Sequence, residues 1–160
     1  MRIVAARLAV SLAAGVALLA VGCGNQGDST PVACLEGAAA YETALRDAPG
    51  EVRLQGDTAI SECLAANQQA GDLAQVGEAM VETATSLNSQ ARKHDGGGAA
   101  VQIGYLLGAA TRGAESSEGI HADLVRRLTV SARYAPGKEP LSPQFLSAYR
   151  EGFDAGHSGG

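Results

Sequence analysis

The segment from residue 99 to residue 115 constrains the fold most, because it is apolar on nearly every side of a helix as far as Ala110. It is shorter than the roughly 20 apolar residues that a membrane-spanning helix needs. A helix without a polar face normally lies at the centre of a bundle. Gly104 and Gly108 are spaced so that a neighbouring backbone can approach closely, which explains two residues that each cost about 1 kcal/mol of helix propensity relative to Ala.

Five further segments carry apolar residues at helical spacing. They cover about residues 33–47, 57–67, 72–94, 120–134 and 142–155. Ser142 and Pro143 form a typical helix start, after which Phe145, Tyr149 and Phe153 make a stripe of core type. The segment 51–57 is expected to be a loop, and the glycine-rich residues 156–160 a loose tail. The prediction is an all-α domain, a single bundle of five to six helices.

Composition agrees with this fold and excludes one class of function. Alanine, which favours helix, is very abundant, with 31 residues, and β-branched residues are too few and scattered for a large sheet. The chain has four Tyr, two Phe and no Trp, with a formal net charge of −5. An acidic chain with few aromatic side chains has little to attract phosphates or to stack on bases. We therefore expect no nucleic-acid partner.

The N-terminal residues have the pattern of an export signal. Arg2 and Arg7 precede an uncharged run of Ala, Leu and Val from residue 8 to residue 21, which is long enough for a signal peptide. The string Leu19-Ala20-Val21-Gly22-Cys23 resembles the lipobox of bacterial lipoproteins. It departs from that pattern at Ala20, where Leu is usual. The resemblance implies cleavage before Cys23 and a diacylglyceryl thioether on its sulfur.

This resemblance also implies a domain organisation and a location. Residues 1–22 are expected to be a cleaved lipoprotein signal peptide, residues 23–31 the lipidated cysteine and a flexible tether, and residues 32–160 the helical domain. Fatty acids such as palmitate on Cys23 would anchor the protein to the cell membrane, on the extracytoplasmic side of the cell envelope. Removal of Arg2 and Arg7 would change the formal charge from −5 to −7.

The cysteine count supports the same interpretation. Three cysteines are an odd number for an exported chain. With lipid on Cys23, Cys34 and Cys63 remain as a pair in an oxidising compartment, where disulfides persist. The alternative is two buried free thiols, since each lies on an apolar helical stripe. We expect a structural disulfide worth about 3–4 kcal/mol, without a redox role because there is no C-x-x-C pair.

Two short motifs resemble catalytic or metal sites without their usual context. Glu118-x-x-His121 has the spacing of a di-iron bundle motif, but the only second candidate is Asp154-x-x-His157 in the expected tail. Gly156, Ser158 and Gly160 match the spacing of a hydrolase nucleophile elbow, which requires a strand–turn–helix context. Neither motif is expected to act. We predict no catalytic residue, no metal ligand and no cofactor-binding residue, and therefore no cofactor.

The domain is thus expected to be non-catalytic and to act through protein contacts or as a structural element of the envelope. The alternative is a small-ligand-binding module with a cavity between helices. An enzyme with a site that the sequence does not reveal is the third class. An apolar cavity lined by the helix over 99–115 would favour ligand binding, whereas an exposed apolar patch would favour a partner protein.

Overall fold

The computed structural model describes residues 29–94, 97–117 and 119–160, so Cys23 and the rest of the lipobox lie outside the described part. The described residues form five α-helices and three short 3-10 turns, and no strand was found among them. The elements in chain order are η1 (Val32–Leu35), α1 (Ala38–Ala44), η2 (Leu45–Asp47), η3 (Ile60–Cys63), α2 (Ala70–Lys93), α3 (Gly98–Glu115), α4 (Ala122–Arg133) and α5 (Pro143–Gly159). The all-α bundle predicted from the sequence is confirmed.

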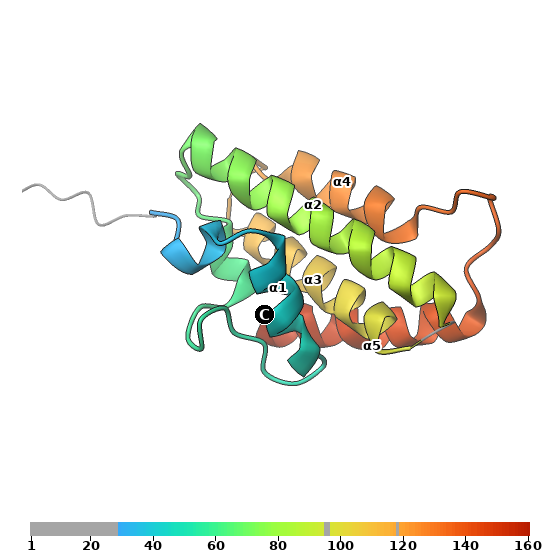
Figure 1. The fold of residues 1–160 in the computed structure, drawn as a ribbon. Coiled ribbons are helices and arrows are strands. Elements are labelled where there is room, and N and C mark those ends of the chain that lie inside the picture. The colour runs from blue at the N-terminus through green and yellow to red at the C-terminus, as the bar shows by residue number, and fades with distance from the viewer. Residues whose placement is uncertain (1–28, 95–96, 118) are drawn as a thin grey trace, which may run out of the picture.

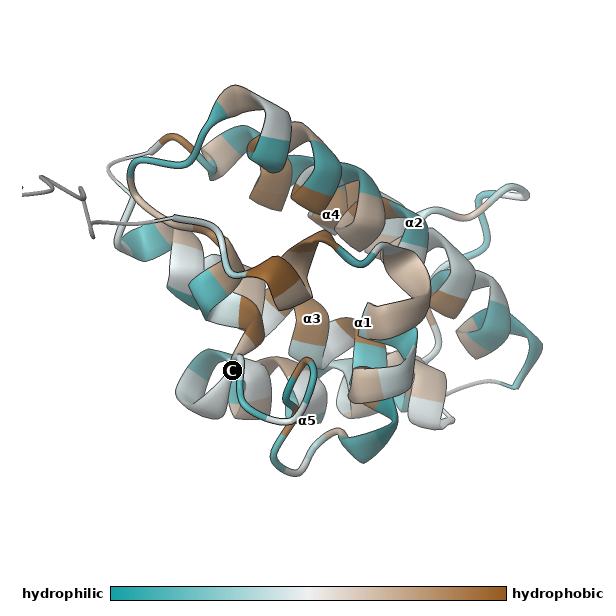
Figure 2. Cartoon of the chain, turned by 60° about the vertical axis from the view of Figure 1, so that its left-hand side comes forward, coloured by the Kyte–Doolittle hydropathy of each residue, from teal (hydrophilic) through white to brown (hydrophobic). Residues whose placement is uncertain are grey.

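Helix α3 is the centre of this bundle (Figure 1). It packs against α2, α4 and α5, and also against η2 and η3. Hydrophobic residues gather on α3 and on the sides of the helices that face it, and hydrophilic residues cover the outer faces (Figure 2). None of the described helices combines the length and the hydrophobicity of a membrane-spanning segment. The prediction that residues 99–115 form a buried helix is therefore correct.

The closest packing in the bundle joins α3 to α5 through glycines on both helices. A Cβ on Gly104 would collide with Tyr149 O and would lie 2.8 Å from Phe153 N. The reverse contacts involve Gly152 and Gly156 of α5, where a Cβ would collide with the backbone carbonyls of Val101 and Tyr105. Only glycine fits at these four-residue intervals. The two helices therefore interlock along their backbones and run in the same direction.

The sequence did not predict the C-terminal residues correctly. Residues 156–159 continue α5, and Gly160 is buried against Ala109, with its N–H donating to Gly156 O at 2.8 Å. Glycine disfavours helix in isolation, but here its small size lets the end of α5 pack on α3. At the other end of α5 the predicted cap is confirmed, since Ser142 Oγ accepts from Phe145 N at 3.0 Å.

The two N-terminal helices predicted from the sequence are wrong in detail. The segment 33–47 is divided into η1, α1 and η2, because Gly37 has φ +81°, which ends a helical path. The segment 57–67 contains only the 3-10 turn η3, which ends at Leu64 with φ −111° and ψ 64°. Val52 and Leu54 before it are fully buried, so contacts with the core override local helix propensity.

Candidate functional site

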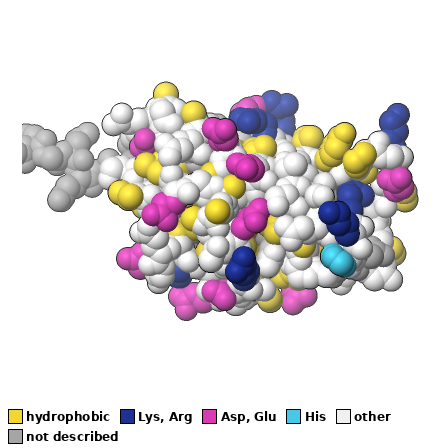
Figure 3. Space-filling view, viewed as in Figure 1, with side chains coloured by type: hydrophobic (Ala, Val, Ile, Leu, Met, Phe, Trp, Pro, Cys, Tyr) yellow, Lys and Arg dark blue, Asp and Glu magenta, His cyan; other side chains and the backbone are white. Residues whose placement is uncertain are grey.

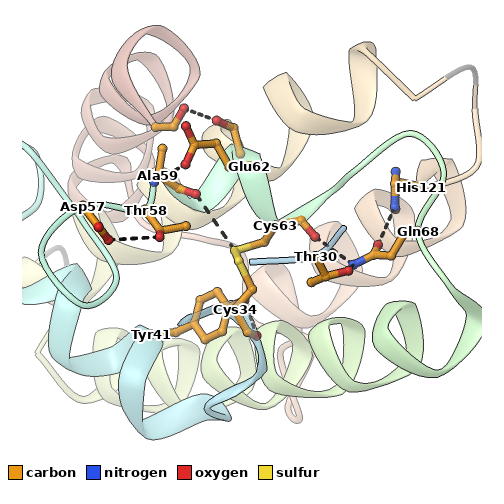
Figure 4. The surroundings of a disulfide bond; sticks show 12 residues. Thr30, Cys34, Tyr41, Asp57, Thr58, Ala59, Glu62, Cys63, Gln68 and His121 are labelled. Carbon is orange, nitrogen blue, oxygen red and sulfur yellow. Dashed lines mark hydrogen bonds between the residues drawn. A yellow bond between two sulfur atoms is a disulfide. The ribbon is translucent and has the colours of Figure 1, made fainter. Parts of the chain in front are cut away.

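Cys34 and Cys63 form the expected disulfide, with a Cα–Cα distance of 5.4 Å (Figure 4). The bond joins η1 to η3 rather than two α-helices, and both cysteines are fully buried. Tyr41 OH donates to Cys34 O at 3.0 Å, and burial raises the pKa of the Tyr41 phenol. The disulfide therefore belongs to a closed core and fixes the N-terminal segment to the domain.

A chain of hydrogen bonds beside the disulfide links the start of the described chain to the start of α4 (Figure 4). Gln68 Nε2 donates to Thr30 Oγ1 at 2.9 Å and to Cys63 O at 3.0 Å. Its Oε1 is then left to accept from His121 Nε2 at 2.8 Å. The His121 Nδ1 lone pair is buried without a partner, and burial lowers the pKa of this histidine. Thr30 is thus held by the domain at the side where α4 begins.

The catalytic and metal motifs of the sequence are not assembled into a site. Glu118 lies outside the described residues. His157 Nε2 lies 3.0 Å from Glu115 Oε1 on the surface, and Ser158 is an exposed residue of α5 whose hydroxyl donates to Asp154 O. Within the described ranges, no group of three or more His, Cys, Asp or Glu residues could hold a metal ion.

The exposed side of α4 and its C-cap carries apolar, aromatic and basic side chains close together. We call this surface the α4 face and define it by six exposed residues. They are Asp123, Arg126, Arg127, Val130, Arg133 and Tyr134. Val130 is 64% exposed and Tyr134 is 60% exposed, so an apolar and an aromatic side chain stand in solvent among arginines. Single exposed apolar residues are common, but here two of them lie one helical turn apart beside a cleft, which makes this surface the candidate site.

The arginines of this surface are mostly free of carboxylate partners. Of the ion pairs found in the described residues, the one on the α4 face joins Arg126 to Asp123. Arg133 lies over the Tyr149 ring, 5.5 Å from its centroid. Burial raises the pKa of Tyr149, and the Arg133 charge opposes that shift. Arg127, and Arg150 on the adjacent α5, make no ion pair with the described carboxylates. The α4 face is therefore basic within an acidic protein.

A cleft of about 600 Å³ separates the α4 face from α2 and is open to solvent. Its apolar wall comes from Val130, Tyr134 and Pro136. The remaining lining residues are Thr85, Asn88, Ser89, Arg92, Ser131, Gly137 and Glu139. The cleft lies at the end of α2 and α4 opposite to the start of the described chain, where residues 134–142 cross over to α5 (Figure 1).

Two side chains of α2 hold the crossing segment in place. Asn88 Nδ2 donates to Tyr134 O at 2.7 Å, and Arg92 Nε donates to the same oxygen at 2.8 Å. Arg92 Nη2 also donates to Arg133 O at 3.2 Å. Asn88 is only 4% exposed, and its Oδ1 has no hydrogen-bond partner. These bonds fix the backbone at Tyr134, so its exposed ring is presented from a defined position.

A second depression, of about 350 Å³, lies on the other side of α4. Leu107, Tyr149 and Phe153 contribute apolar atoms, and Arg133 and Arg150 contribute guanidinium groups. Thr111, Thr129 and Asp154 complete the lining. The α4 face is therefore a ridge with a groove on each side, which is a shape that an extended or helical segment of another protein can follow.

Sequence reasoning missed this surface, although a signal was present. Eight of the ten Lys and Arg residues after Cys23 lie at position 92 or later, whereas nine acidic residues lie between 36 and 82. Figure 3 shows the same separation, with acidic side chains mainly over the half near the chain start and several basic ones toward the other end. Arg126 and Arg127 are adjacent, but Arg133 follows six residues later, so the three form no basic run. Helical spacing nevertheless places Arg126 and Arg133 on one face, with Arg127 at its side.

Comparison with protein-family models, with curated proteins and with solved structures gives no match to this chain.

Proposed function

We propose that this protein is a membrane-anchored lipoprotein of the cell envelope, held by lipid on Cys23, whose helical domain is non-catalytic and acts by docking a partner protein on the α4 face. The lipobox-like string and the odd number of cysteines support the lipid anchor on Cys23. The formation of the Cys34–Cys63 disulfide supports it, because that pairing leaves Cys23 for lipid and suits an oxidising compartment.

The observation that supports docking of a partner protein is the exposure of Val130 and Tyr134 on the rim of the α2–α4 cleft. Tyrosine and arginine are the residue types most enriched at the energetic centres of protein interfaces. Both types are present on the α4 face, and the backbone carbonyl of Tyr134 is fixed by two hydrogen bonds. A surface that is already ordered binds with less loss of conformational entropy.

Binding of a small ligand in the same cleft is the alternative function. The unpartnered Oδ1 of Asn88 favours it, because a ligand N–H or O–H could satisfy a buried acceptor. However, the apolar wall of the cleft is formed by residues that are themselves exposed, Val130, Tyr134 and Pro136, and the cleft is partly open to solvent. Small-ligand sites usually bury most of the ligand surface. The partner-docking proposal therefore has the better support.

The test is the size of the protein's complex in native membranes. Membranes are solubilised in a mild neutral detergent, and the wild type is compared on a native gel with the double variant Val130→Glu, Tyr134→Glu. We expect the wild type to migrate in a larger complex and the variant to migrate alone while staying in the membrane fraction. A double variant at exposed α1 and η2 positions, Thr43→Glu with Arg46→Glu, is the control. Equal migration of all three proteins would contradict docking through the α4 face.

A further inference from the structure

We infer that the partner presents an acidic segment with at least one apolar side chain, and that this segment lies along α4. The inference rests on the proposed function and specifies the chemistry of the partner. Its first support is charge. Arg127, Arg133 and Arg150 have no ion-pair partner among the described carboxylates, and Arg126 has only Asp123. Carboxylates of a partner would form ion pairs with these guanidinium groups.

The second support is the placement of the apolar groups between the arginines. Val130 lies one helical turn after Arg126 and Arg127 and one turn before Arg133 and Tyr134. The surface therefore alternates basic, apolar and basic along the axis of α4. An acidic segment with a matching alternation would place a hydrophobic side chain against Val130 and Tyr134 while its carboxylates reach the guanidinium groups on both sides.

The third support concerns the site that the apolar side chain would occupy. Val130 and Ser131 line both the α2–α4 cleft and a small depression of about 220 Å³, which also involves Val81, Arg126 and Arg127. An apolar side chain can therefore fill a hollow directly beside two guanidinium groups. Hydrophobic burial in the centre with charge pairing at the edge is the usual anatomy of a specific interface.

An anionic membrane surface is the other acidic partner to consider, and the shape of the α4 face argues against it. The ridge is bordered by grooves of about 600 Å³ and 350 Å³, which a flat bilayer would leave unfilled. The exposed carboxylates of Asp123 on α4 and of Asp154 in the groove toward α5 would also meet that surface. A narrow peptide segment can follow the arginines without covering these acidic groups.

The test measures binding of a defined peptide to the mature lipoprotein in a neutral detergent. The probe is a short peptide, blocked at both ends and carrying a neutral fluorophore, in which Glu and Leu alternate at helical spacing. Anisotropy is recorded for the wild type, for Arg126→Gln with Arg127→Gln, and for the matched control Arg46→Gln with Arg53→Gln. The two double variants lose the same charge, but only the first loses it on the α4 face. Circular dichroism verifies that each variant is folded.

We expect the peptide to bind the wild type and the control equally, and the α4 variant about tenfold more weakly, with binding reduced by salt in each case. A peptide with Ser in place of Leu should bind more weakly than the probe. Equal weakening in both variants, or no binding to the wild type at low salt, would overturn the acidic-segment inference. If the α4 face nevertheless forms the native complex, partner docking survives and only the partner's chemistry is wrong.

A second measurement on the wild type separates the membrane alternative. The lipoprotein is placed in nanodiscs of neutral phosphatidylcholine or of phosphatidylcholine mixed with anionic phosphatidylglycerol, and trypsin cleavage after Arg126 and Arg127 is followed. We expect equal cleavage in both kinds of disc. If anionic discs alone protect Arg126 and Arg127 from trypsin, and the peptide does not bind, the acidic partner of the α4 face would be the membrane surface and not a protein segment.

Discussion

Gly108 of α3 lies against the backbone of Phe153 in α5, so closely that a Cβ on Gly108 would collide with Phe153 O and would lie 2.8 Å from His157 N. This contact places α5, and with it Tyr149, beside α3 and α4. The aromatic groove under Arg133 therefore depends on the interlocking of two helices at glycines. A close approach of backbones, rather than a large apolar side chain, determines the geometry at this position.

Replacing Gly108 with leucine is expected to destabilise the domain, because the added side chain must push α5 away. Overpacking of this kind costs about 1–3 kcal/mol, although leucine has the higher helix propensity. Thermal unfolding measures the effect. The control is Gly71→Ala in the first turn of α2, where an added Cβ would meet no atom within 4 Å, so the midpoint should stay or rise. An unchanged midpoint for Gly108→Leu would contradict the interlocked packing.

Loss of the Cys34–Cys63 disulfide is expected to lower the free energy of unfolding by about 3–4 kcal/mol, since the bond closes a loop between residues 29 apart in sequence. The double variant Cys34→Ala, Cys63→Ala is compared with the wild type by urea unfolding. Alkylation of the unreduced mature protein should label neither cysteine. Two labelled thiols would show that the bond does not form in the cell.

Acid is expected to destabilise the domain through His121. Burial lowers the pKa of this ring below its ordinary value of 6.5, so the unfolded chain binds a proton more readily than the folded one. The contribution of His121 to the free energy of unfolding is therefore fully present at a pH above the ordinary histidine pKa. It decreases as the pH falls from there toward the lowered pKa of the folded state. A proton on Nδ1 would also have no acceptor, because that atom is buried without a partner.

The variant His121→Gln should accordingly lose less stability than the wild type between about pH 7.5 and about pH 5, although it is less stable than the wild type at the higher pH. Urea unfolding at several pH values gives the slope of the free energy of unfolding against pH for the wild type and for the variant. His94→Gln, at an exposed histidine, is the control for loss of an imidazole. Identical slopes for His121→Gln and the wild type would show that this ring does not set the acid sensitivity.

Lipid on Cys23 is expected in the mature protein, as the lipobox-like string predicts. Intact-mass analysis of the membrane fraction should find a chain that begins at Cys23 and carries a diacylglyceryl group. A mature chain that begins elsewhere and carries no lipid would remove the anchor from the proposed function, while leaving the description of the α4 face unchanged.

The sequence predicted α2, α4 and α5, whose apolar residues recur at helical spacing, and α3, which is apolar on nearly every side. It failed where packing competes with local preference. Gly37 interrupts the first predicted helix with a left-handed backbone conformation, and residues 57–67 resemble an amphipathic helix although contacts with the core hold most of them in a loop. At the other end, Gly156 looked like a helix breaker and instead packs on Tyr105.

The candidate site was hidden from the sequence for a related reason. The disulfide could be predicted, because it required only a count of cysteines and an oxidising compartment. The α4 face requires the neighbours of α4, since Asn88 and Arg92 come from a helix about 40 residues earlier and fix the position of Tyr134. Gly152 and Gly156 show the spacing already noted at Gly104 and Gly108, and comparing the two pairs would have revealed the α3–α5 contact.

The most direct test of partner docking on the α4 face is site-specific photo-crosslinking in living cells of the organism that produces the protein. A photoreactive amino acid replaces Val130 in one strain and Thr43, an exposed residue of α1, in another. We predict one discrete adduct from position 130, absent from position 43 and lost when Arg126→Gln and Arg127→Gln are added. No adduct at position 130, or the same adducts from both positions, would contradict the claim that the α4 face is where this protein meets its partner.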